Sequence, residues 1–521
     1  MIDKNRYKNS LVFREFNSSE QKEFFDCKQK KYLHHIDNIY YSVSLEGDYI
    51  NNTSGEIIKF IDDLSILKDL LNKSNSDSDW FDSDKTILLT RGTYAIFYTF
   101  RLSVNGLCDI YIAKNLPNDK TPRIVVQLRA EGIWSLGEYT SLIRSYEVLV
   151  DIFNRYGIQI NDIKENRIDY AFHTNCIQNV NAFYSDKSLI KNLKSPFVSG
   201  AKYFNRANGY LETHTLQLGN RKSNNLFFRS YNKVAEILDV SHKFWFFDIW
   251  LYEGLISKYD YHVFNYCAKE KKKFKAIEWG MADFYINYGK NPIIREKLKL
   301  IVNDPNSNVT YLREIIKGLL PKCTQVFNIE FQTMRKFYNS SDNLIVTLPF
   351  RSDLLYKSNY DLDKLVKIFQ ILDNRDIFID YLTSKTVSFV RDINVEYPKG
   401  TSDKVIYLDF WYRLRSVRTD KLTKYELSRF YKNTPADRNR TIKDIKRSFA
   451  KLALIDGLEE TDINEDMSLA INILNDNDHI VENDGTIRIK DNEYMIIKEK
   501  QKKAFKSPLN NGTNKDLQKN K

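Results

Sequence analysis

One tyrosine in this sequence stands between two basic residues at a spacing that suits phosphate chemistry. Arg229, Tyr231 and Lys233 alternate along and just beyond the apolar run from Leu226 to Tyr231, and alternate residues of a β-strand point to one face. A free phenol has a pKa of about 10 and attacks poorly at neutral pH. Two cations on its own face would favour the phenolate and would also bind a phosphate. The spacing therefore indicates a phosphate-attacking tyrosine, although a half-buried strand tyrosine of no catalytic role has the same spacing.

The tyrosine lies on the second arm of a predicted β-hairpin. Strand-forming residues run from Tyr210 to Leu218, and the polar run from Asn220 to Asn225 supplies the turn. Within this turn, Arg221 and Lys222 suit contacts to the phosphates of a displaced single strand of DNA. A solvated turn is the alternative for Lys222.

Two other predicted strands carry acidic side chains that can bind a metal ion. The alternating run from Arg167 to Asn175 puts Asp169 and His173 on one face, and Glu330 faces away from its apolar neighbours. Four residues along a strand span about 13 Å, so Asp169 and His173 cannot share one cation. We expect Asp169 and Glu330 to bind Mg²⁺ or Mn²⁺. We expect His173 to be hydrogen-bonded at the surface or to contact DNA.

Two ion pairs bear on these assignments. Glu330 can pair with Arg167 of a neighbouring strand instead of binding a metal, and the sequence leaves both alternatives open. Glu236 follows Lys233 by three residues, which is the spacing of an ion pair within a helix. We expect Glu236 to orient the lysine.

The composition favours a globular protein with a polyanionic partner. Hydrophobic residues make up 42% of the 521 residues, and 79 basic residues against 68 acidic ones give a net charge of +11. Aromatic residues reach 14%, and flat rings beside cations are what single-stranded nucleic acid stacks on. A basic solvated surface with the rings in the core is the alternative.

Cysteine usage and hydropathy indicate a cytoplasmic protein. The five cysteines are scattered and form no CxxC pair, which excludes both a disulfide framework and a cysteine zinc site. The N-terminus has no apolar signal region, and no run approaches the roughly 18 apolar residues that a membrane span needs. We expect no contact with a membrane.

The pattern along the chain predicts helices and antiparallel strands, and thus an α+β fold. The run from Gly137 to Tyr156 has helical spacing, followed by a glycine cap. An antiparallel meander precedes it. Its predicted strands are Lys85–Thr90, Tyr94–Val104, Leu107–Ala113 and Arg123–Arg129.

We predict four parts along the chain. A polar segment, residues 1–33, precedes a large domain, 34–340, in which all the strands above lie. A smaller and mainly helical region, 345–497, ends in two strands around an Asp-Gly turn, which is the outline of a winged helix. We expect this region to be an accessory domain that binds DNA or mediates self-association. Residues 498–521 form a basic tail with little to bury, so we expect it to be disordered.

Four stretches within residues 34–340 together resemble a known family. They are VQLRAEGIW (126–134), NRIDYAFHTN (166–175), LGNRKSNNLFFRSYNKVAE (218–236) and FNIEFQTMRKF (327–337). Their order and spacing are similar to those of replication-initiation proteins of rolling-circle plasmids, and more narrowly of the Rep_trans group. That group also includes relaxases of conjugative elements.

The resemblance implies an enzyme that nicks one strand of DNA at a plasmid origin. Tyr231 would be the nucleophile and would stay linked to the 5′-phosphate, while the freed 3′-hydroxyl primes replication. Asp169 and Glu330 would serve a divalent metal. The family's fold is a central antiparallel sheet with packed helices, so the resemblance implies an α+β fold of that kind. The chain has no His-x-His triplet, so we expect a metal site that is not of the bis-histidine kind.

Three functions follow as alternatives. The first is a plasmid replication initiator that recognises an origin hairpin in single-stranded and duplex DNA, with a host helicase and a second copy of the chain as partners. The second is a relaxase of a mobilisable element, which uses the same chemistry. The third is a DNA-binding initiator or regulator that does not cleave and so does not depend on Tyr231.

Overall fold

The computed structural model describes most of the chain up to residue 417 and short pieces beyond it. The described residues are 9–27, 31–49, 52–74, 77–92, 97–118, 121–177, 193–195, 202–208, 211–219, 225–269, 276–304, 307–339, 342–390, 407–417, 468, 479–481 and 487–489. The chain divides into two compact units, Met1–Ser428 and Arg429–Lys521. Each is described by itself.

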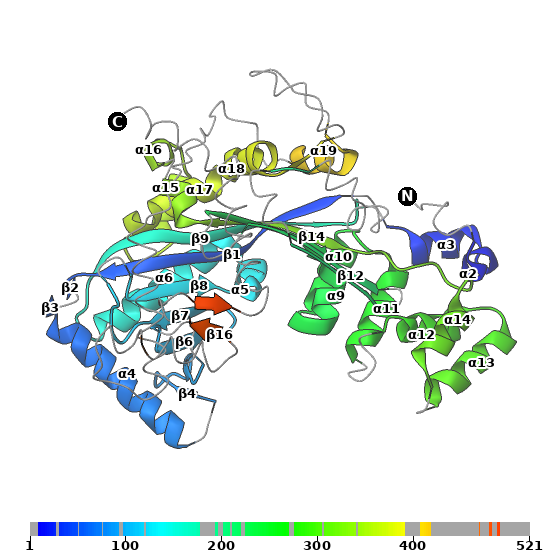
Figure 1. Cartoon of the computed structure of the whole chain (residues 1–521), viewed down its shortest axis with the longest axis horizontal. Helices are drawn as coiled ribbons and strands as arrows, with labels where there is room; N and C mark the ends of the chain where they lie inside the picture. Colours follow the sequence, from blue (N-terminus) through cyan, green and yellow to red (C-terminus); the bar gives the residue numbers. More distant parts are fainter. Residues whose placement is uncertain are drawn as a thin grey trace. The chain divides into compact units, whose positions relative to one another are not determined.

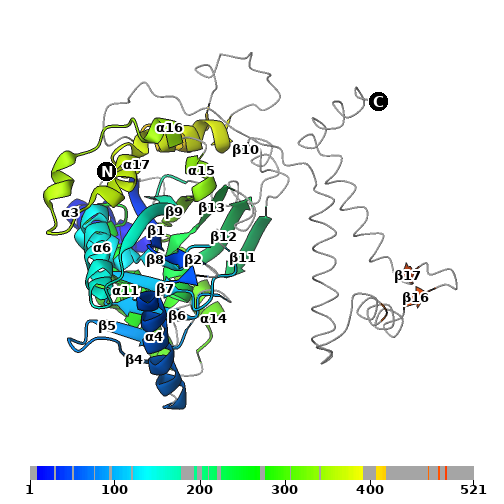
Figure 2. The ribbon, with the colours of Figure 1, turned by 90° about the vertical axis from the view of Figure 1, so that its left-hand side faces the viewer.

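An eleven-stranded sheet dominates the first unit (Figure 1). Its order is β11-β12-β13-β14-β9-β1-β8-β7-β6-β5-β4, and Figure 2 shows β11, β12 and β13 side by side at one end. Each neighbouring pair is antiparallel. The strands are β1 (Tyr32–Leu45), β4 (Ser78–Trp80), β5 (Ile87–Thr90), β6 (Phe100–Val104), β7 (Cys108–Ile112), β8 (Ile124–Leu128), β9 (Ile160–Thr174), β11 (Lys202–Asn208), β12 (Leu211–Leu218), β13 (Leu226–Asn232) and β14 (Phe327–Met334).

Smaller strand pairs lie outside this sheet. They are β2 (Asp48–Tyr49) with β3 (Asn52–Thr53), β10 (Leu193–Lys194) with β15 (Ser388–Phe389), and β16 (His479–Val481) with β17 (Ile487–Ile489). The last pair belongs to the second unit and matches the two strands predicted there, while the predicted turn between them lies outside the described residues. The predicted helices after residue 417 lie outside the described residues.

Helices flank the sheet in the first unit. The α-helices are α2 (Leu11–Glu15), α3 (Ser18–Phe25), α4 (Gly55–Lys73), α5 (Ala130–Leu136), α6 (Glu138–Asn154), α9 (Lys233–Glu236), α10 (Trp245–Tyr252), α11 (Lys258–Lys269), α12 (Glu278–Tyr288), α13 (Pro292–Asn303), α14 (Val309–Ile316), α15 (Arg335–Asn339), α16 (Asp342–Ile345), α17 (Val366–Asp373), α18 (Arg375–Tyr381) and α19 (Asp409–Arg415). Short 3₁₀ and π turns are η2 (Ile237–Ser241), η3 (Ser352–Tyr356), η4 (Asp363–Leu365) and η5 (Leu382–Thr386). No helix among the described residues is both long and apolar enough to span a bilayer.

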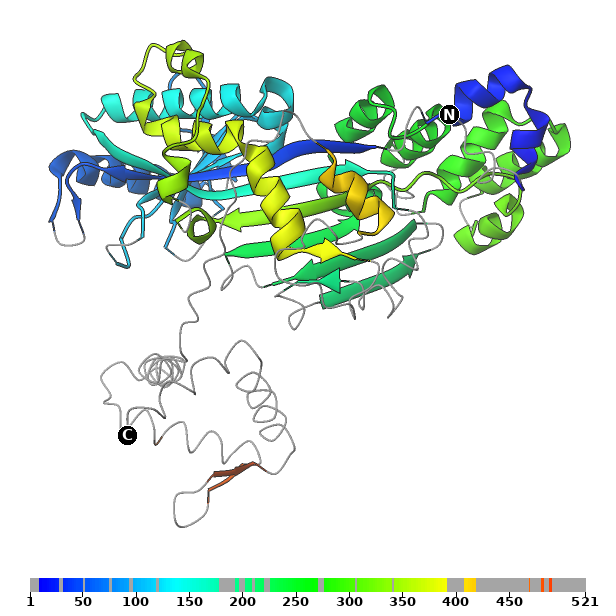
Figure 3. The same ribbon diagram turned by 90° about the horizontal axis from the view of Figure 1, so that it is seen from above.

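Side-chain alternation gives the sheet one apolar and one polar face. Tyr170 and Phe331 are fully buried on the apolar face, where α6, α17, α18 and α19 share their core. Seen from above, the yellow and orange helices α18 and α19 lie across the strands (Figure 3). A second core joins α2 and α3 to α10–α14. The N-terminal segment predicted to be polar thus contributes Val12 and Phe25 to a core.

The predicted α+β class with a central antiparallel sheet is confirmed. The meander strands, the hairpin arms and the strand around Glu330 all form within a few residues of the predicted bounds, except that β6 begins at Phe100 and β9 begins earlier, at Ile160. Period-two patterning succeeded where alternate strand residues pack on helices, as Tyr170 of β9 and Phe331 of β14 do.

Residues beyond the predicted division at 339–345 belong to the same core as the sheet. Ile345, Leu372 and Trp411 are buried with the strand residues, and the ring of Trp411 lies 6.3 Å from Phe228 and 6.2 Å from Phe331. The first compact unit accordingly runs to Ser428. A separate function for residues 345–497 stays a prediction.

This packing predicts the effect of truncating Trp411. Trp411→Ala should lower the free energy of unfolding of the first unit by about 3–5 kcal/mol, because it removes a buried indole and leaves a cavity. Denaturant unfolding measures this change. Tyr412→Ala on the same helix is the matched control, since Tyr412 is 65% exposed and its loss should change stability by about 0.5 kcal/mol or less. Equal effects of the two substitutions would mean that α19 does not pack on the sheet.

Candidate functional site

The predicted hairpin is present and lies inside the sheet. Strands β12 and β13 pair antiparallel with Gln217 opposite Arg229 and Thr215 opposite Tyr231, and β14 pairs along the other side of β13. The backbone around Tyr231 is therefore held from both sides. Arg221 and Lys222, predicted to contact DNA, lie outside the described residues.

Hydrogen-bond donors surround the hydroxyl of Tyr231. Asn328, directly opposite on β14, donates from Nδ2 to the Tyr231 oxygen at 2.9 Å. The Lys233 ammonium lies 3.5 Å from the same oxygen, and the Arg229 guanidinium lies 4.9 Å from the centre of the phenol ring. Donors and cations stabilise a phenolate more than a phenol, so this arrangement suits an anionic oxygen.

Burial and charge act in opposite directions on the Tyr231 phenol. Burial raises the pKa of Tyr231 to about 12, while Lys233 and Arg229 oppose that rise. Burial by itself would lower the pKa of Lys233, but Tyr231, Asp37 and Glu236 raise it overall. Lys233 therefore stays protonated and acts as a cation rather than as a base.

Both cations beside Tyr231 already have acidic partners. Arg229 NH2 lies 2.7 Å from Glu330, and Lys233 Nζ lies 2.9 Å from Glu236. The predicted ion pair between Lys233 and Glu236 is thus present. Glu330 pairs with Arg229 and not with Arg167, because Arg229 stands opposite it in the register of β13 and β14. An incoming phosphate would share these cations with the carboxylates.

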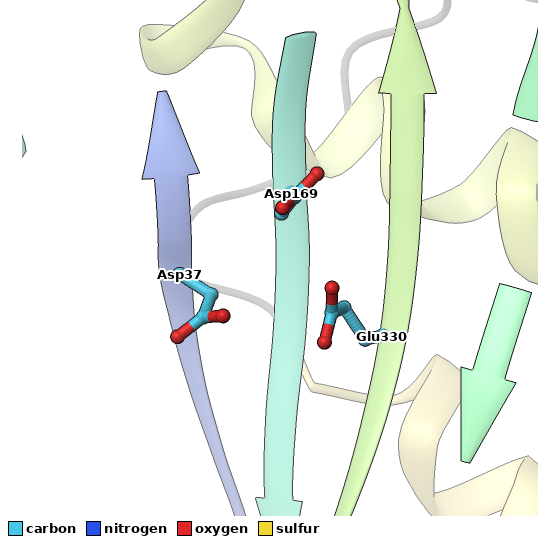
Figure 4. Close-up of side chains that lie close together, drawn as sticks. All are labelled: Asp37, Asp169 and Glu330. Carbon is cyan, nitrogen blue, oxygen red and sulfur yellow. The ribbon is translucent and has the colours of Figure 1, made fainter. Parts of the chain in front are cut away.

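Three carboxylates meet on the polar face, one from each of three adjacent strands (Figure 4). Asp37 of β1, Asp169 of β9 and Glu330 of β14 each offer an oxygen, and these oxygens lie within 4.8 Å of one another. All three residues are buried. The structure brings the predicted pair Asp169 and Glu330 together and adds Asp37, which the sequence prediction missed.

A β-bulge places Asp37 in this cluster. The register of β1 against β9 shifts between Ile36 and Asn38, so Asp37 is the extra residue of the bulged strand. A bulge bends the strand and re-aims side chains, and here it lets Asp37 and Asn38 both reach the polar face. The consecutive polar residues Asp37 and Asn38 between Ile36 and Ile39 are the sequence signal that could have marked this position.

Polar neighbours hold the carboxylates in place. Arg167 binds both oxygens of Asp169, with Nε 2.7 Å from Oδ1. Asn38 Nδ2 donates to Asp37 at 3.1 Å and to Asp169 at 3.3 Å. Gln332 donates to Glu330. Burial raises the pKa of Asp169 to about 6 against the opposing charge of Arg167, so this carboxyl is mostly ionised at neutral pH.

The carboxylate cluster fits a small divalent cation. Mg²⁺ and Mn²⁺ prefer oxygen ligands at about 2.1 Å and keep open positions for water or substrate phosphate. The Asp37 Oδ1 atom is buried and has no hydrogen-bond partner among the residues that the structure describes. A buried anionic oxygen without a partner is costly, and a cation bound there would satisfy it.

His173 lies near the cluster but is fully buried. The Trp250 indole donates to its Nδ1 at 3.2 Å, and burial, then His35, lower its pKa well below the ordinary value. The ring is therefore neutral and carries its proton on Nε2. The DNA contact predicted for His173 stays a prediction that its burial does not favour.

Comparison with known proteins found little similarity to this chain. No protein-family model matches it, and no curated protein matches it. A solved structure of a rolling circle replication initiator protein from Geobacillus stearothermophilus is similar over 75% of this chain and 100% of that chain, with 11% sequence identity and a TM-score of 0.32. At that TM-score the likeness supports neither fold nor function, so both rest on this chain's own residues.

Proposed function

We propose that this protein is a metal-dependent nickase and strand transferase that cuts one strand of DNA at a plasmid origin and starts rolling-circle replication. The observation that carries the proposal is the position of Tyr231. Its oxygen receives hydrogen bonds from Asn328 and Lys233, and Asn328 also donates to Glu330 of the carboxylate cluster at 3.2 Å. Nucleophile and cation site are thus joined by one side chain.

The proposed reaction is a transfer of the DNA phosphate to the phenol. The Tyr231 oxygen attacks phosphorus, the bond between phosphorus and the 3′ oxygen breaks, and that oxygen leaves and takes up a proton. The phenol proton passes to solvent before or during the attack. The products are a 5′-phosphotyrosine link and a DNA strand with a free 3′-hydroxyl, so no bond energy is lost to hydrolysis.

Each side chain has one role in this reaction. Lys233 and Asn328 hold the Tyr231 oxygen as an anion, and Arg229 binds a non-bridging oxygen of the phosphate. Asp37, Asp169 and Glu330 would hold the cation. A bound Mg²⁺ or Mn²⁺ would polarise the phosphate and balance its developing charge.

A DNA cleavage assay with covalent trapping tests the function. The full-length protein is incubated with supercoiled plasmid of its own replicon and Mn²⁺ or Mg²⁺, and the products are separated with and without protease. We expect open-circular DNA that carries protein on its 5′ end, and none when a chelator is present. Specific DNA binding without any nicking would instead favour a non-catalytic initiator.

Asn328 provides a specific test of how the phenolate is held. Asn328→Leu should reduce cleavage by about 100-fold, the usual loss when one donor to a reacting anion is removed. Gln332→Leu is the matched control, because Gln332 lies four residues along the same strand and donates to Glu330 but makes no hydrogen bond to Tyr231. Cleavage rates under single-turnover conditions compare the two. Equal losses would mean that Asn328 acts only through Glu330.

A further inference from the structure

His35 is a buried side chain that the proposed reaction leaves without a role. Its side chain is 7% exposed, and its Nε2 has no hydrogen-bond partner in the described part of the chain. Its Nδ1 lies 3.4 Å from the carbonyl oxygen of Leu33. A carbonyl can only accept, so the proton sits on Nδ1 and the lone pair is on Nε2. Metal-binding histidines characteristically have this arrangement.

The free nitrogen of His35 faces the free oxygen of Asp37. His35 Nε2 lies 3.9 Å from Asp37 Oδ1, too far for a hydrogen bond, and neither atom has a hydrogen-bond partner among the described residues. Two ligands of one cation, each bound at about 2.1 Å, lie roughly 3 to 4.2 Å apart. The separation therefore fits a shared cation.

The other histidine of this region is excluded as a ligand. The indole of Trp250 donates to Nδ1 of His173, so Nε2 of His173 carries the proton and has no lone pair to offer. The His35 ring lies with its centre 4.4 Å from His173 and 4.7 Å from Trp134. These two rings hold the imidazole of His35 beside Asp37.

We propose that His35 supplies a nitrogen ligand to the cation that Asp37, Asp169 and Glu330 bind. The nitrogen ligand His35 and the oxygen ligand Asp37 lie two residues apart on β1. Imidazole binds transition metals much better than Mg²⁺, which prefers oxygen ligands. The centre accordingly selects Mn²⁺ over Mg²⁺. The inference rests on the proposed function, because it names the cofactor class of that site.

Metal binding measured on the full-length protein tests this directly. Titration calorimetry with Mn²⁺ and with Mg²⁺ should show that His35→Gln weakens Mn²⁺ binding by about ten-fold or more, as loss of a ligand does. Mg²⁺ binding should change by about two-fold or less. Pulsed electron spin resonance of the Mn²⁺ form should show coupling to an imidazole nitrogen that His35→Gln removes.

A second variant and a control separate ligation from damage to the fold. His35→Phe keeps a ring between Trp134 and His173 but has no nitrogen, so it should weaken Mn²⁺ binding as much as His35→Gln does. His262→Gln is the control, because His262 pairs with Asp283 on other helices at 2.8 Å and should leave Mn²⁺ binding unchanged. Thermal unfolding confirms that each variant is folded.

Two results would overturn the proposal. One is a wild-type Mn²⁺ spectrum without nitrogen coupling, and the other is equal weakening of Mn²⁺ and Mg²⁺ in folded His35→Gln protein. These measurements use no DNA. If the wild-type protein does not nick DNA, the proposed function fails and the assignment of His35 as a metal ligand stands. If His35 proves not to be a ligand, the proposed function stands.

Discussion

Tyr231→Phe is expected to abolish both strand cleavage and the covalent protein–DNA link. The substitution removes only the attacking oxygen and leaves the ring in place between Arg229 and Asn328. Since Tyr231 is 8% exposed and Asn328 loses one hydrogen-bond acceptor, the fold should lose about 1 kcal/mol. A full loss of cleavage would then result from the missing attacking oxygen and not from unfolding. Denaturing gels of labelled origin DNA measure cleavage and adduct together.

Tyr40→Phe is the matched control for this experiment. Tyr40 is buried on β1, with the Arg167 guanidinium 5.0 Å from its ring centre, so it resembles Tyr231 in burial and in its cationic neighbour. It should retain cleavage. Adduct formation that survives Tyr231→Phe but disappears in Tyr40→Phe would move the nucleophile to β1 and remove the proposed role of Tyr231.

Asp169→Asn should have the second largest effect. It removes one of the three carboxylates of the cation site while keeping the side chain's shape, and cation-dependent cleavage should fall by about 100-fold or more. Binding to duplex origin DNA should remain, because no step of binding requires the cation. Gel-shift titration and single-turnover cleavage measure the two separately.

The partner of Asp169 complicates this substitution and also supplies its control. Arg167 binds both oxygens of Asp169, and removing one member of a buried ion pair costs about 3–5 kcal/mol. The double substitution Asp169→Asn with Arg167→Gln removes both charges and should recover most of that stability but no cleavage. Wild-type cleavage in folded Asp169→Asn protein would sink the proposed cation site.

The sequence predicts the strands and their polar residues better than it predicts which strands are adjacent in the sheet. Alternation alone puts Asp169 and Glu330 on polar faces, and the structure brings them together. The ion pair of Glu330 was not predictable, because it depends on which strands are adjacent: β13 lies against β14, so Glu330 meets Arg229. Patterning within one strand carries no information about the order of strands in a sheet.

Residues that break the alternation were missed for a related reason. A β-bulge lets the consecutive residues Asp37 and Asn38 both reach the polar face, whereas a strict period of two assigns consecutive residues to opposite faces. The His-x-His pattern describes two histidines of one strand and therefore does not mark His35. His35 and His173 instead approach from two adjacent strands, β1 and β9.

Tyr231 lies on a strand inside the sheet, and this position determines whether the protein or the DNA must move in the proposed reaction. Strands β12 and β14 fix the backbone of Tyr231 on both sides, so the proposed nucleophile cannot travel toward a distant phosphate as a residue on a loop can. In the proposed reaction the DNA therefore has to bend. Duplex DNA is stiff over roughly 150 base pairs, whereas an unpaired strand turns freely within a few nucleotides. An immobile nucleophile of this kind works best on a segment that has already been unpaired, such as the loop of an extruded hairpin.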